Sequence, residues 1–207
     1  MSPRRYASET REASSRATRR RIVLGALDLI KAEGGLSDFT MELVAKRSGV
    51  SRMTVYYQFH ARADLLDALF DELVERGHLV AGIEGALEET DALMVVDRLV
   101  DAFCTLWSAE PLAMRRLRSL AAVDPSLEAD LRVRDDRRRL AVRMTVDRLA
   151  AAGVVETATA QESIEALNAL LSFEVWDILG GRDGRVDEAR SRVHALVNAA
   201  IGSATAR

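Results

Sequence analysis

Residues 40–60, TMELVAKRSGVSRMTVYYQFH, contain the strongest local signal in the chain. Thr40 and Ser51 are each suited to cap a helix, because a hydroxyl oxygen can accept a free backbone N–H at a helix start. Gly49 lies between them and can adopt the positive φ that ends a helix without a Cβ clash. The stretch therefore predicts two short helices joined by a tight turn, which is a helix-turn-helix.

The second helix of this pair has two different faces. Val55 and Phe59 are four residues apart, so they share the inward side of a helix. The opposite side carries an arginine, hydroxyl groups and two tyrosines. Arginine can donate paired hydrogen bonds to a guanine edge and hydroxyls reach phosphates, so this side suits the major groove of DNA. The alternative is an ordinary helical hairpin whose aromatic residues complete the core.

Further matches to one known pattern extend on both sides of this stretch. The matching segments are Arg20–Ile30, Phe39–Thr40, Val44–Ala45, Gly49–Arg52, Val55–Tyr57, Phe59 and Leu65–Leu66. Together they make residues 18–70, about a quarter of the chain, resemble the tetracycline-repressor (TetR) family of bacterial transcription regulators. Beyond residue 70, the chain matches the family only in length and helical texture.

The resemblance implies an all-α fold with two parts. An N-terminal three-helix helix-turn-helix domain binds DNA, and a larger C-terminal helical domain dimerises and holds a small inducer. The predicted organisation is a basic, disordered arm over 1–17, a DNA-binding domain over 18–62 and a ligand-binding and dimerisation domain over 63–207. Periodic apolar positions and helix stop signals predict about nine helices in total.

Candidate DNA contacts follow from the exposed side of the second short helix and from its flanks. The residues predicted to contact bases are Arg52, Met53 and Tyr56. The residues predicted to contact phosphates are Thr40, Ser51, Thr54, Tyr57, His60 and Arg62. The last of these lies close to a helix N-terminus, which itself favours anions.

Three positions depart from the family pattern. Met53 stands where the family often has glycine or a small residue, and we expect it to alter which base is recognised. His60 stands where proline or lysine is usual. Ala61 replaces the usual serine or asparagine and cannot cap the next helix through its side chain, a loss of about 1 kcal/mol. Asp64, in the first turn of that helix, is expected to offset part of this through the helix dipole.

The charge distribution agrees with two parts of different function, a DNA-binding N-terminal domain (the head) and a C-terminal domain that does not bind DNA (the body). The net charge is −3, yet residues 1–60 contain 11 Lys/Arg and 6 Asp/Glu whereas residues 61–207 contain 18 and 26. A basic head on an acidic body is expected when only the head binds DNA. One hypothesis is that the arginine-rich arm reaches a minor groove or the phosphates. The alternative is a solvated tail without fixed contacts.

Two helices near the C-terminus are candidates for a dimer interface. The pattern Thr159–Glu162 predicts a capping box that opens a helix ending at Gly180–Gly181, and this helix has only a narrow polar strip. With the last helix it is expected to form a four-helix packing across a two-fold axis. The predicted interface residues are Ile164, Leu167, Leu171, Val175, Ile178, Val193, Leu196, Val197 and Ala200. The alternative is that the first of the two helices is the core of a monomer.

An apolar, partly aromatic inducer pocket is predicted in the body. The candidate lining residues are Phe103, Trp107, Met144, Phe173 and Trp176, with Glu174 and Asp177 near the aromatic pair. Aromatic side chains would supply apolar area, and a carboxylate would orient a cationic or hydroxylated ligand. For each aromatic residue, plain core packing is the alternative.

Other features argue against different classes of protein. The three histidines form no metal pair, Glu75–His78 is a single Glu-x-x-His, and no phosphate loop or nucleophile elbow appears, so neither an enzyme nor a metal or cofactor site is expected. Cys104 is alone, which fits the cytoplasm and a buried small residue, with redox sensing as the alternative. No signal peptide or membrane span is predicted.

The sequence thus predicts a ligand-responsive regulator that binds a palindromic operator as a dimer. Repression is the commoner mode in the family, and a small-molecule inducer would release the DNA. An architectural DNA-binding protein without ligand control is the main alternative, and a helical-bundle enzyme is the remaining one.

Overall fold

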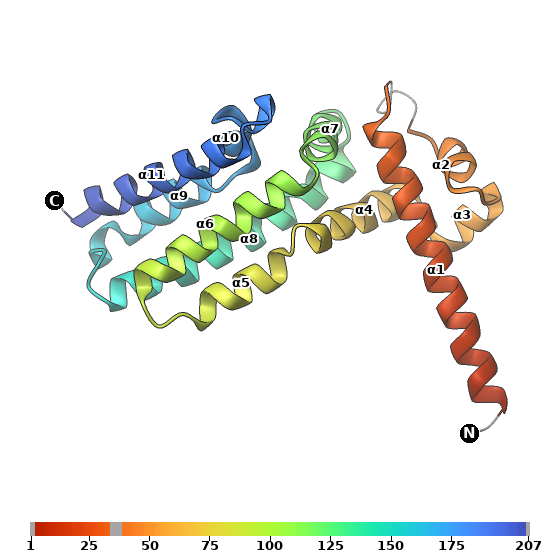
Figure 1. Ribbon diagram of the computed structural model, residues 1–207, viewed down its shortest axis with the longest axis horizontal. Helices are drawn as coiled ribbons and strands as arrows, with labels where there is room; N and C mark the ends of the chain where they lie inside the picture. The colour runs from red at the N-terminus through yellow and green to blue at the C-terminus, as the bar shows by residue number, and fades with distance from the viewer. Residues whose placement is uncertain (1–2, 34–38, 206–207) are drawn as a thin grey trace. The chain divides into compact units, whose positions relative to one another are not determined.

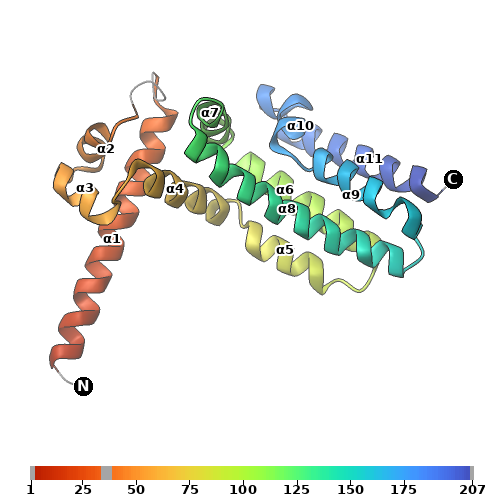
Figure 2. The same ribbon diagram turned by 180° about the vertical axis from the view of Figure 1, so that it is seen from behind.

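The computed structural model describes residues 3–33 and 39–205, and these residues form an all-α fold (Figures 1 and 2). No β-strand occurs among these described residues. The helices are α1 (Pro3–Lys31), α2 (Met41–Ser48), α3 (Arg52–Gln58), α4 (Arg62–Arg76), α5 (Leu79–Glu88), α6 (Ala92–Ala109), α7 (Pro111–Ala121), α8 (Pro125–Ala151), α9 (Ala160–Leu170), α10 (Phe173–Ile178) and α11 (Val186–Thr205). Two short 3-10 helices cover Thr157–Thr159 and Gly181–Asp183.

The all-α prediction is confirmed, but the described part of the chain has eleven α-helices instead of about nine. One additional helix is α5, in a segment with few sequence signals. The other arises because the predicted helix after Thr159 is broken between α9 and α10. The predicted capping box is also wrong, because the Thr159 hydroxyl donates to the carbonyl of Glu156 at 3.1 Å and does not cap α9.

At the break between α9 and α10, two backbone groups that would bond each other in a continuous helix have side-chain partners instead. In a continuous helix, the Val175 N–H would donate to the Leu171 carbonyl. Here the Val175 N–H donates to the Ser172 hydroxyl at 3.3 Å, which caps α10. The Leu171 carbonyl accepts from the indole N–H of Trp107 on α6 at 3.1 Å. Both backbone groups therefore keep a partner inside the fold.

The chain divides into two compact units. Unit 1 comprises the residues up to Glu72 together with Arg115–Glu128, and unit 2 comprises Leu73–Met114 together with the residues from Ala129 onward. This division differs from the predicted boundary after residue 62. Most of α4, the second half of α7 and the first turn of α8 belong with the helix-turn-helix.

The predicted disordered arm is largely helical. Helix α1 begins at Pro3 and ends at Lys31, so residues 3–17 of the predicted arm are part of this helix. Residues 1 and 2 of the arm lie outside the described residues. The basic N-terminal segment is therefore an extension of the first helix of the head.

The helix-turn-helix is built by the local signals that predicted it. The Thr40 hydroxyl accepts from the Leu43 N–H at 3.2 Å, and the Ser51 hydroxyl accepts from the Thr54 N–H at 3.0 Å. Gly49 ends α2 with φ +63°, in the left-handed region. Helix α2 packs against both α1 and α3. The fully buried apolar side chains of this part are Ile22, Ala26, Ile30, Val44, Val55 and Phe59.

Unit 2 is a helical body in which α6 is a central element. Helices α5 and α11 pack against α6, and α9 packs against α11. Both ring nitrogens of His194 on α11 lie 3.1 Å from carboxylate oxygens of α6, one on Asp97 and one on Asp101. Apolar packing and this polar contact together join α6 to α11.

None of the described helices combines the length and the apolar character that crossing a bilayer requires.

The close approach of α1 and α2 generates a stability prediction at Gly25. A Cβ there would lie 2.2 Å from the Ser48 hydroxyl oxygen, which is held by donation to the Val44 carbonyl at 2.6 Å. We expect Gly25→Ala to lower the free energy of unfolding by about 1–3 kcal/mol, because overpacking outweighs the helix propensity of alanine. Urea unfolding monitored by circular dichroism measures this change.

Gly85 in α5 provides the matched control. Apart from its chain neighbours and the nearby backbone of its own helix, nothing lies within 4 Å of a Cβ built at this position. Gly85→Ala should therefore raise the free energy of unfolding by up to about 1 kcal/mol. Similar effects of the two substitutions would contradict the tight packing assigned to Gly25.

Candidate nucleic-acid interface

Contacts with α1 fix the C-terminal end of α3. They involve Gln58, the last residue of α3, and Phe59, which follows it. Phe59 is fully buried, and the guanidinium carbon of Arg19 lies 4.0 Å from the centre of its ring. Arg19 also donates to the Gln58 carbonyl at 2.6 Å, and the Gln58 amide donates to the Ser15 hydroxyl at 3.0 Å. The cation–π contact and the two hydrogen bonds hold the C-terminal end of α3 against α1.

The structure brings the predicted base-contacting residues together on the outer side of α3. Met53 is 79% exposed, Tyr57 is 78% exposed and Tyr56 is 37% exposed. The Arg52 guanidinium lies 5.5 Å from the Tyr56 ring centre, so the two side chains are neighbours one turn apart. Val55, on the opposite side, is fully buried. The tyrosines and Arg52 do not complete the core, which contradicts the ordinary-hairpin alternative.

Three predicted phosphate-contacting hydroxyls lie at the starts of α2 and α3. Thr40 and Ser51 are exposed N-caps, and Thr54 lies in the first turn of α3. The hydroxyls of Ser51 and Thr54 are 2.8 Å apart and share one hydrogen bond. Because that bond uses one hydroxyl proton, the other hydroxyl of this pair still has a proton to donate outward.

The start of α4 has a capping arrangement that the sequence indicated only in part. The Ala61 N–H donates to the Asp64 carboxylate at 3.1 Å, which is the second half of a capping box. Asp64 therefore compensates for Ala61 through a hydrogen bond as well as through the helix dipole. The predicted phosphate contact His60 is exposed, with its Nδ1 3.9 Å from the same carboxylate.

Arg62 is the one predicted phosphate contact that has an acidic partner at hydrogen-bond distance. Its Nη1 donates to the Asp124 carboxylate at 2.7 Å, and its guanidinium carbon lies 5.4 Å from the Phe39 ring centre. Asp124 is the residue before α8, and its other carboxylate oxygen accepts from the backbone of Ser126 and Leu127. No pattern in the sequence indicated this ion pair, because its two residues are 62 positions apart.

A second arginine of unit 1 also joins segments far apart in the sequence. Arg116 on α7 donates to the carbonyls of Ile30 and Ala32 at the C-terminal end of α1. A cation at this end is favourable, because the last carbonyls of a helix lack backbone partners and carry partial negative charge. No sequence signal could have shown this contact, because Arg116 lies more than 80 positions after the carbonyls it binds.

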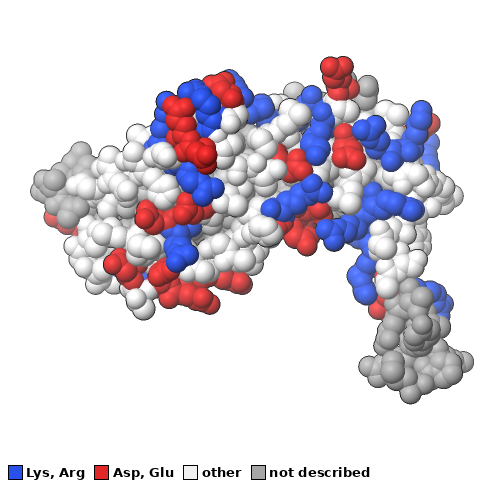
Figure 3. Space-filling view, viewed as in Figure 1, with Lys and Arg blue, Asp and Glu red and all other residues white. Residues whose placement is uncertain are grey.

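The head is the basic part of the surface in the view of Figure 3. Lys and Arg predominate over α1 to α3, whereas both signs of charge mix over the turn between α10 and α11. This distribution agrees with the positive balance of residues 1–60. A basic surface around an exposed helix is the electrostatic pattern expected of a DNA-binding domain.

Comparison with known families identifies this part of the chain. Residues 22–69, from within α1 to α4, match the family described as "Bacterial regulatory proteins, tetR family". Residues 22–69 are a TetR-family helix-turn-helix domain. The resemblance inferred from the sequence is therefore confirmed.

Two relatives, both from Pseudomonas putida, match a segment of this chain. The HTH-type transcriptional regulator SrpR is 36% identical over 66 residues, which are 32% of this chain and 29% of the relative. The uncharacterised HTH-type transcriptional regulator TtgW is 35% identical over 66 residues, which are 32% of this chain and 46% of the relative. The match thus spans less than half of either relative.

Solved structures extend the similarity of fold to the body. A TetR transcription regulator from Haloarcula marismortui has a TM-score of 0.73 at 20% identity, covering 91% of this chain and 98% of that one. A protein described as a transcriptional regulator from Saccharomonospora viridis, in complex with choline, has a TM-score of 0.68 at 23% identity, covering 87% and 95%. These similarities establish that the body behind the TetR-family domain has the fold of such regulators.

Four of the residues predicted to line the ligand pocket form a row of aromatic rings inside the body. Ring-centre distances are 6.1 Å from Phe103 to Trp107, 5.7 Å from Trp107 to Phe173 and 6.0 Å from Phe173 to Trp176. All four side chains are buried, and the indole N–H of Trp176 is buried without a hydrogen-bond partner. Met144 is 44% exposed on α8 and does not belong to this buried cluster.

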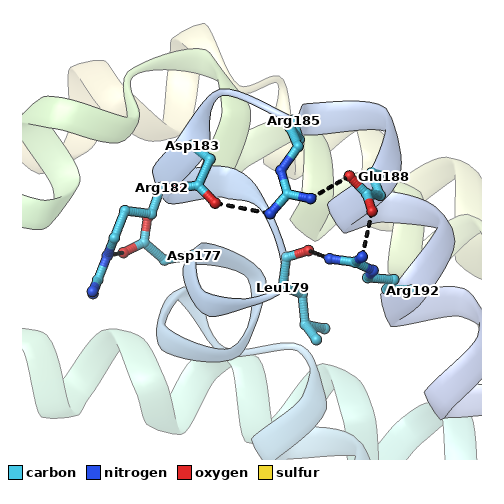
Figure 4. Close-up of polar contacts among 7 residues, drawn as sticks. All are labelled: Asp177, Leu179, Arg182, Asp183, Arg185, Glu188 and Arg192. Atoms are coloured by element: carbon cyan, nitrogen blue, oxygen red, sulfur yellow. Dashed lines mark hydrogen bonds and ion pairs between the residues drawn. The ribbon is translucent and has the colours of Figure 1, made fainter.

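The two predicted acidic ligand residues differ from each other. Glu174 is exposed, whereas Asp177 is buried and its carboxylate lies 3.3 Å from the Arg182 Nε. Figure 4 shows this pair near a separate series of polar contacts at the turn between α10 and α11. In that series, Arg185 contacts Asp183 and Glu188, each at 2.8 Å. Arg192 contacts Glu188 and, at 2.7 Å, the Leu179 carbonyl. The Asp177 carboxylate therefore already has a cationic partner from the chain itself.

Most of the residues predicted for a dimer interface belong to the core of the chain. The buried ones are Ile164, Leu167, Leu171, Val193 and Val197. A buried side chain offers no surface to a second copy, so these five residues pack inside the chain. Val175 and Ala200 are half-buried, while Ile178 and Leu196 are exposed by 71% and 42%.

Cys104 is buried in α6. Burial in apolar surroundings raises the pKa of its thiol to about 12. The side chain is therefore a neutral thiol near pH 7, and the redox-sensing alternative has no support because the thiolate is the reactive form. Within the described residues, no group of three or more His, Cys, Asp or Glu is placed to hold a metal ion.

Proposed function

We propose that the chain is a transcriptional regulator, most simply a repressor, that binds a palindromic DNA operator as a dimer and responds to a small molecule. The observation that carries the proposal is the exposed side of α3, where Met53 and Tyr57 project beside Arg52 while Phe59 anchors the helix. An apolar and aromatic surface beside an arginine suits base edges and the thymine methyl group. The names of the relatives and the fold of the body support the same function.

The proposed contacts divide by chemistry. Arg52, Met53 and Tyr56 contact bases in the major groove, and their neighbours on the outer side of the head bind phosphates. The proposed phosphate-binding residues are Thr40, Ser51, Thr54, Tyr57, His60 and Arg62. Hydroxyls and cations at helix starts are suited to this, because the free N–H groups there also favour anions.

We propose that the dimer forms through the outer sides of α9, α10 and α11. Ile178 and Leu196 are the exposed apolar residues of the predicted set, and Val175 and Ala200 retain partial exposure. Exposed apolar side chains on adjacent helices favour a self-complementary helical packing. Two heads are needed because a single recognition helix contacts only a few base pairs.

We propose that the ligand contacts the aromatic cluster of the body. The buried indole N–H of Trp176, which has no partner, offers a hydrogen bond to an acceptor on the ligand. Aromatic faces also attract cations, and the structure from Saccharomonospora viridis contains choline. Together the two observations favour a small molecule of apolar or cationic character that also carries a hydrogen-bond acceptor.

Selection of bound duplexes from a random pool tests the proposed function. We expect two inverted copies of one half-site, about one DNA turn apart, because a dimer places two α3 helices in successive major grooves. Arg52→Ala should weaken binding by about 1–3 kcal/mol and relax the preference at one base pair of each half-site. Arg98→Ala, at an exposed arginine of α6, should change neither. Failure to enrich any common sequence would refute the proposal.

The helical extension of α1 generates a second prediction. Arg11 lies one turn before Ser15, on the side of α1 that contacts the end of α3, and Arg16 is exposed nearby. We propose that these arginines bind phosphates beside the half-site. Arg11→Gln with Arg16→Gln should reduce the slope of log K against log salt by about 0.9 for each lost contact. Titration of the selected duplex at several salt concentrations measures the slope.

The control for this prediction is a second double variant that loses the same two positive charges elsewhere in the chain. Arg137 and Arg143 are exposed on the part of α8 that belongs to unit 2. Their substitution by glutamine should leave the slope unchanged. Equal slopes for the wild type and for the variant of the extension would show that the extension is a solvated helix without DNA contacts.

Ligand control is tested by a thermal-shift screen with apolar and cationic small molecules, choline included. We expect at least one compound to raise the unfolding temperature and to weaken binding to the selected duplex, since binding to one conformation shifts the population toward it. The shift should shrink in Phe103→Leu and persist in Leu93→Ala, an exposed position on the same helix. A diverse set that contains no stabilising compound would favour the architectural DNA-binding alternative.

A further inference from the structure

The start of α4 and the start of α8 are joined by an ion pair inside unit 1. Arg62 Nη1 and the Asp124 carboxylate are 2.7 Å apart, and the two side chains are 35% and 20% exposed. The Phe39 ring lies beside the guanidinium, 5.4 Å from its carbon to the ring centre. Arg62 is thus held in one place by a carboxylate and by an aromatic ring.

Asp124 is well suited to remain an anion at this position. One carboxylate oxygen accepts from the Ser126 hydroxyl at 2.6 Å and from the backbone N–H groups of Ser126 and Leu127 at 3.2 and 3.3 Å. The other oxygen accepts from Arg62. The Ser126 hydrogen bond, the Leu127 N–H and the Arg62 charge lower the pKa of the carboxyl group. At neutral pH, Arg62 therefore faces a full negative charge from its own chain.

The segment that carries Asp124 is attached to the head independently of this ion pair. Arg116, on the preceding helix α7, donates to the last carbonyls of α1 at Ile30 and Ala32. Both arginine contacts lie within unit 1, which includes Arg115–Glu128. The carboxylate of Asp124 thus belongs to unit 1, as does the recognition helix.

Arg62 is also positioned for a different anion. It follows the exposed residues Tyr57 and His60, and it is the first residue of α4, where free N–H groups favour anions. A phosphate and a carboxylate bind the same N–H groups of a guanidinium, so an arginine between them has two competing partners. We propose that Asp124 competes with the DNA backbone for Arg62, so that binding of an operator requires this ion pair to open.

This inference rests on the proposed function, and it adds a means of control. Helix α8 begins at Pro125 in unit 1 and continues to Ala151 in unit 2. A ligand that favours the form with the closed ion pair lowers DNA affinity by the same factor by which bound DNA lowers the affinity for that ligand. Asp124 is then the residue through which such a ligand limits the contact of Arg62 with DNA.

A double-mutant cycle on Arg62 and Asp124 tests the competition. Asp124→Asn removes the charge and keeps an N-cap for α8, because asparagine caps as well as aspartate. With Arg62 present, Asp124→Asn should tighten binding to the selected duplex by roughly two- to fivefold, the range that a partly exposed ion pair allows. In the Arg62→Gln background, Asp124→Asn should leave the affinity unchanged. Fluorescence anisotropy with labelled duplex measures all four affinities.

The control neutralises a carboxylate in unit 2 that forms an ion pair of similar length and exposure. Glu110 pairs with Arg76 at 2.6 Å, with side-chain exposures of 17% and 35% that match the first pair. Glu110→Gln makes the same change in net charge and should leave DNA affinity near that of the wild type. Thermal unfolding verifies that each variant is folded, and Asp124→Ser provides a second neutral N-cap if the asparagine variant is unstable.

The possible outcomes separate this inference from the function on which it rests. Recovery of a palindrome by the wild type, with tighter binding by Asp124→Asn only when Arg62 is present, supports the competition. Equal effects of Asp124→Asn and Glu110→Gln, or an effect that persists in the Arg62→Gln background, overturn the competition and leave the regulator proposal intact. A wild type that selects no duplex overturns both.

Discussion

The contact between the buried Phe59 ring and the Arg19 guanidinium is the interaction on which the exposed side of α3 depends. Helix α3 has only seven residues, too few to be stable alone, so tertiary contacts must determine its orientation. Val55 and Phe59 supply the buried side, and Arg19 and Ser15 hold the carbonyl and side-chain amide of Gln58. With the inner side fixed in this way, the outer side has no alternative but to face solvent or DNA.

Much of the head could be predicted from the sequence because its determinants are local. A cap, a left-handed glycine and apolar residues four positions apart act over one or two turns, so Thr40, Gly49 and Ser51 were interpretable without any distant contact. The body was less predictable for the opposite reason. The long helix expected after Thr159 is divided because the indole of Trp107, more than 60 positions earlier, provides a partner for the carbonyl that the break leaves free. Periodicity alone contains no information about such a partner.

The site shows the same division between local and distant causes. Exposure of Met53 and Tyr57 follows from the helical period once Val55 and Phe59 are known to be buried. The ion pair of Arg62, in contrast, depends on a residue 62 positions away, and a sequence pattern shows only that Arg62 begins a helix. Residues buried around the body helices also appeared as interface candidates, because an apolar face looks the same whether a neighbouring helix or a second copy covers it.

The hydrogen bonds from Arg116 to the end of α1 have a consequence for how domains of such proteins can be exchanged. A helix-turn-helix at the start of a chain invites transplantation, with the first seventy residues moved onto another body to combine one operator specificity with another inducer. In this molecule, such a graft would leave behind the guanidinium that covers the last carbonyls of α1. The exchangeable unit is discontinuous, and a functional chimera would have to carry residues 115–128 along with the N-terminal segment.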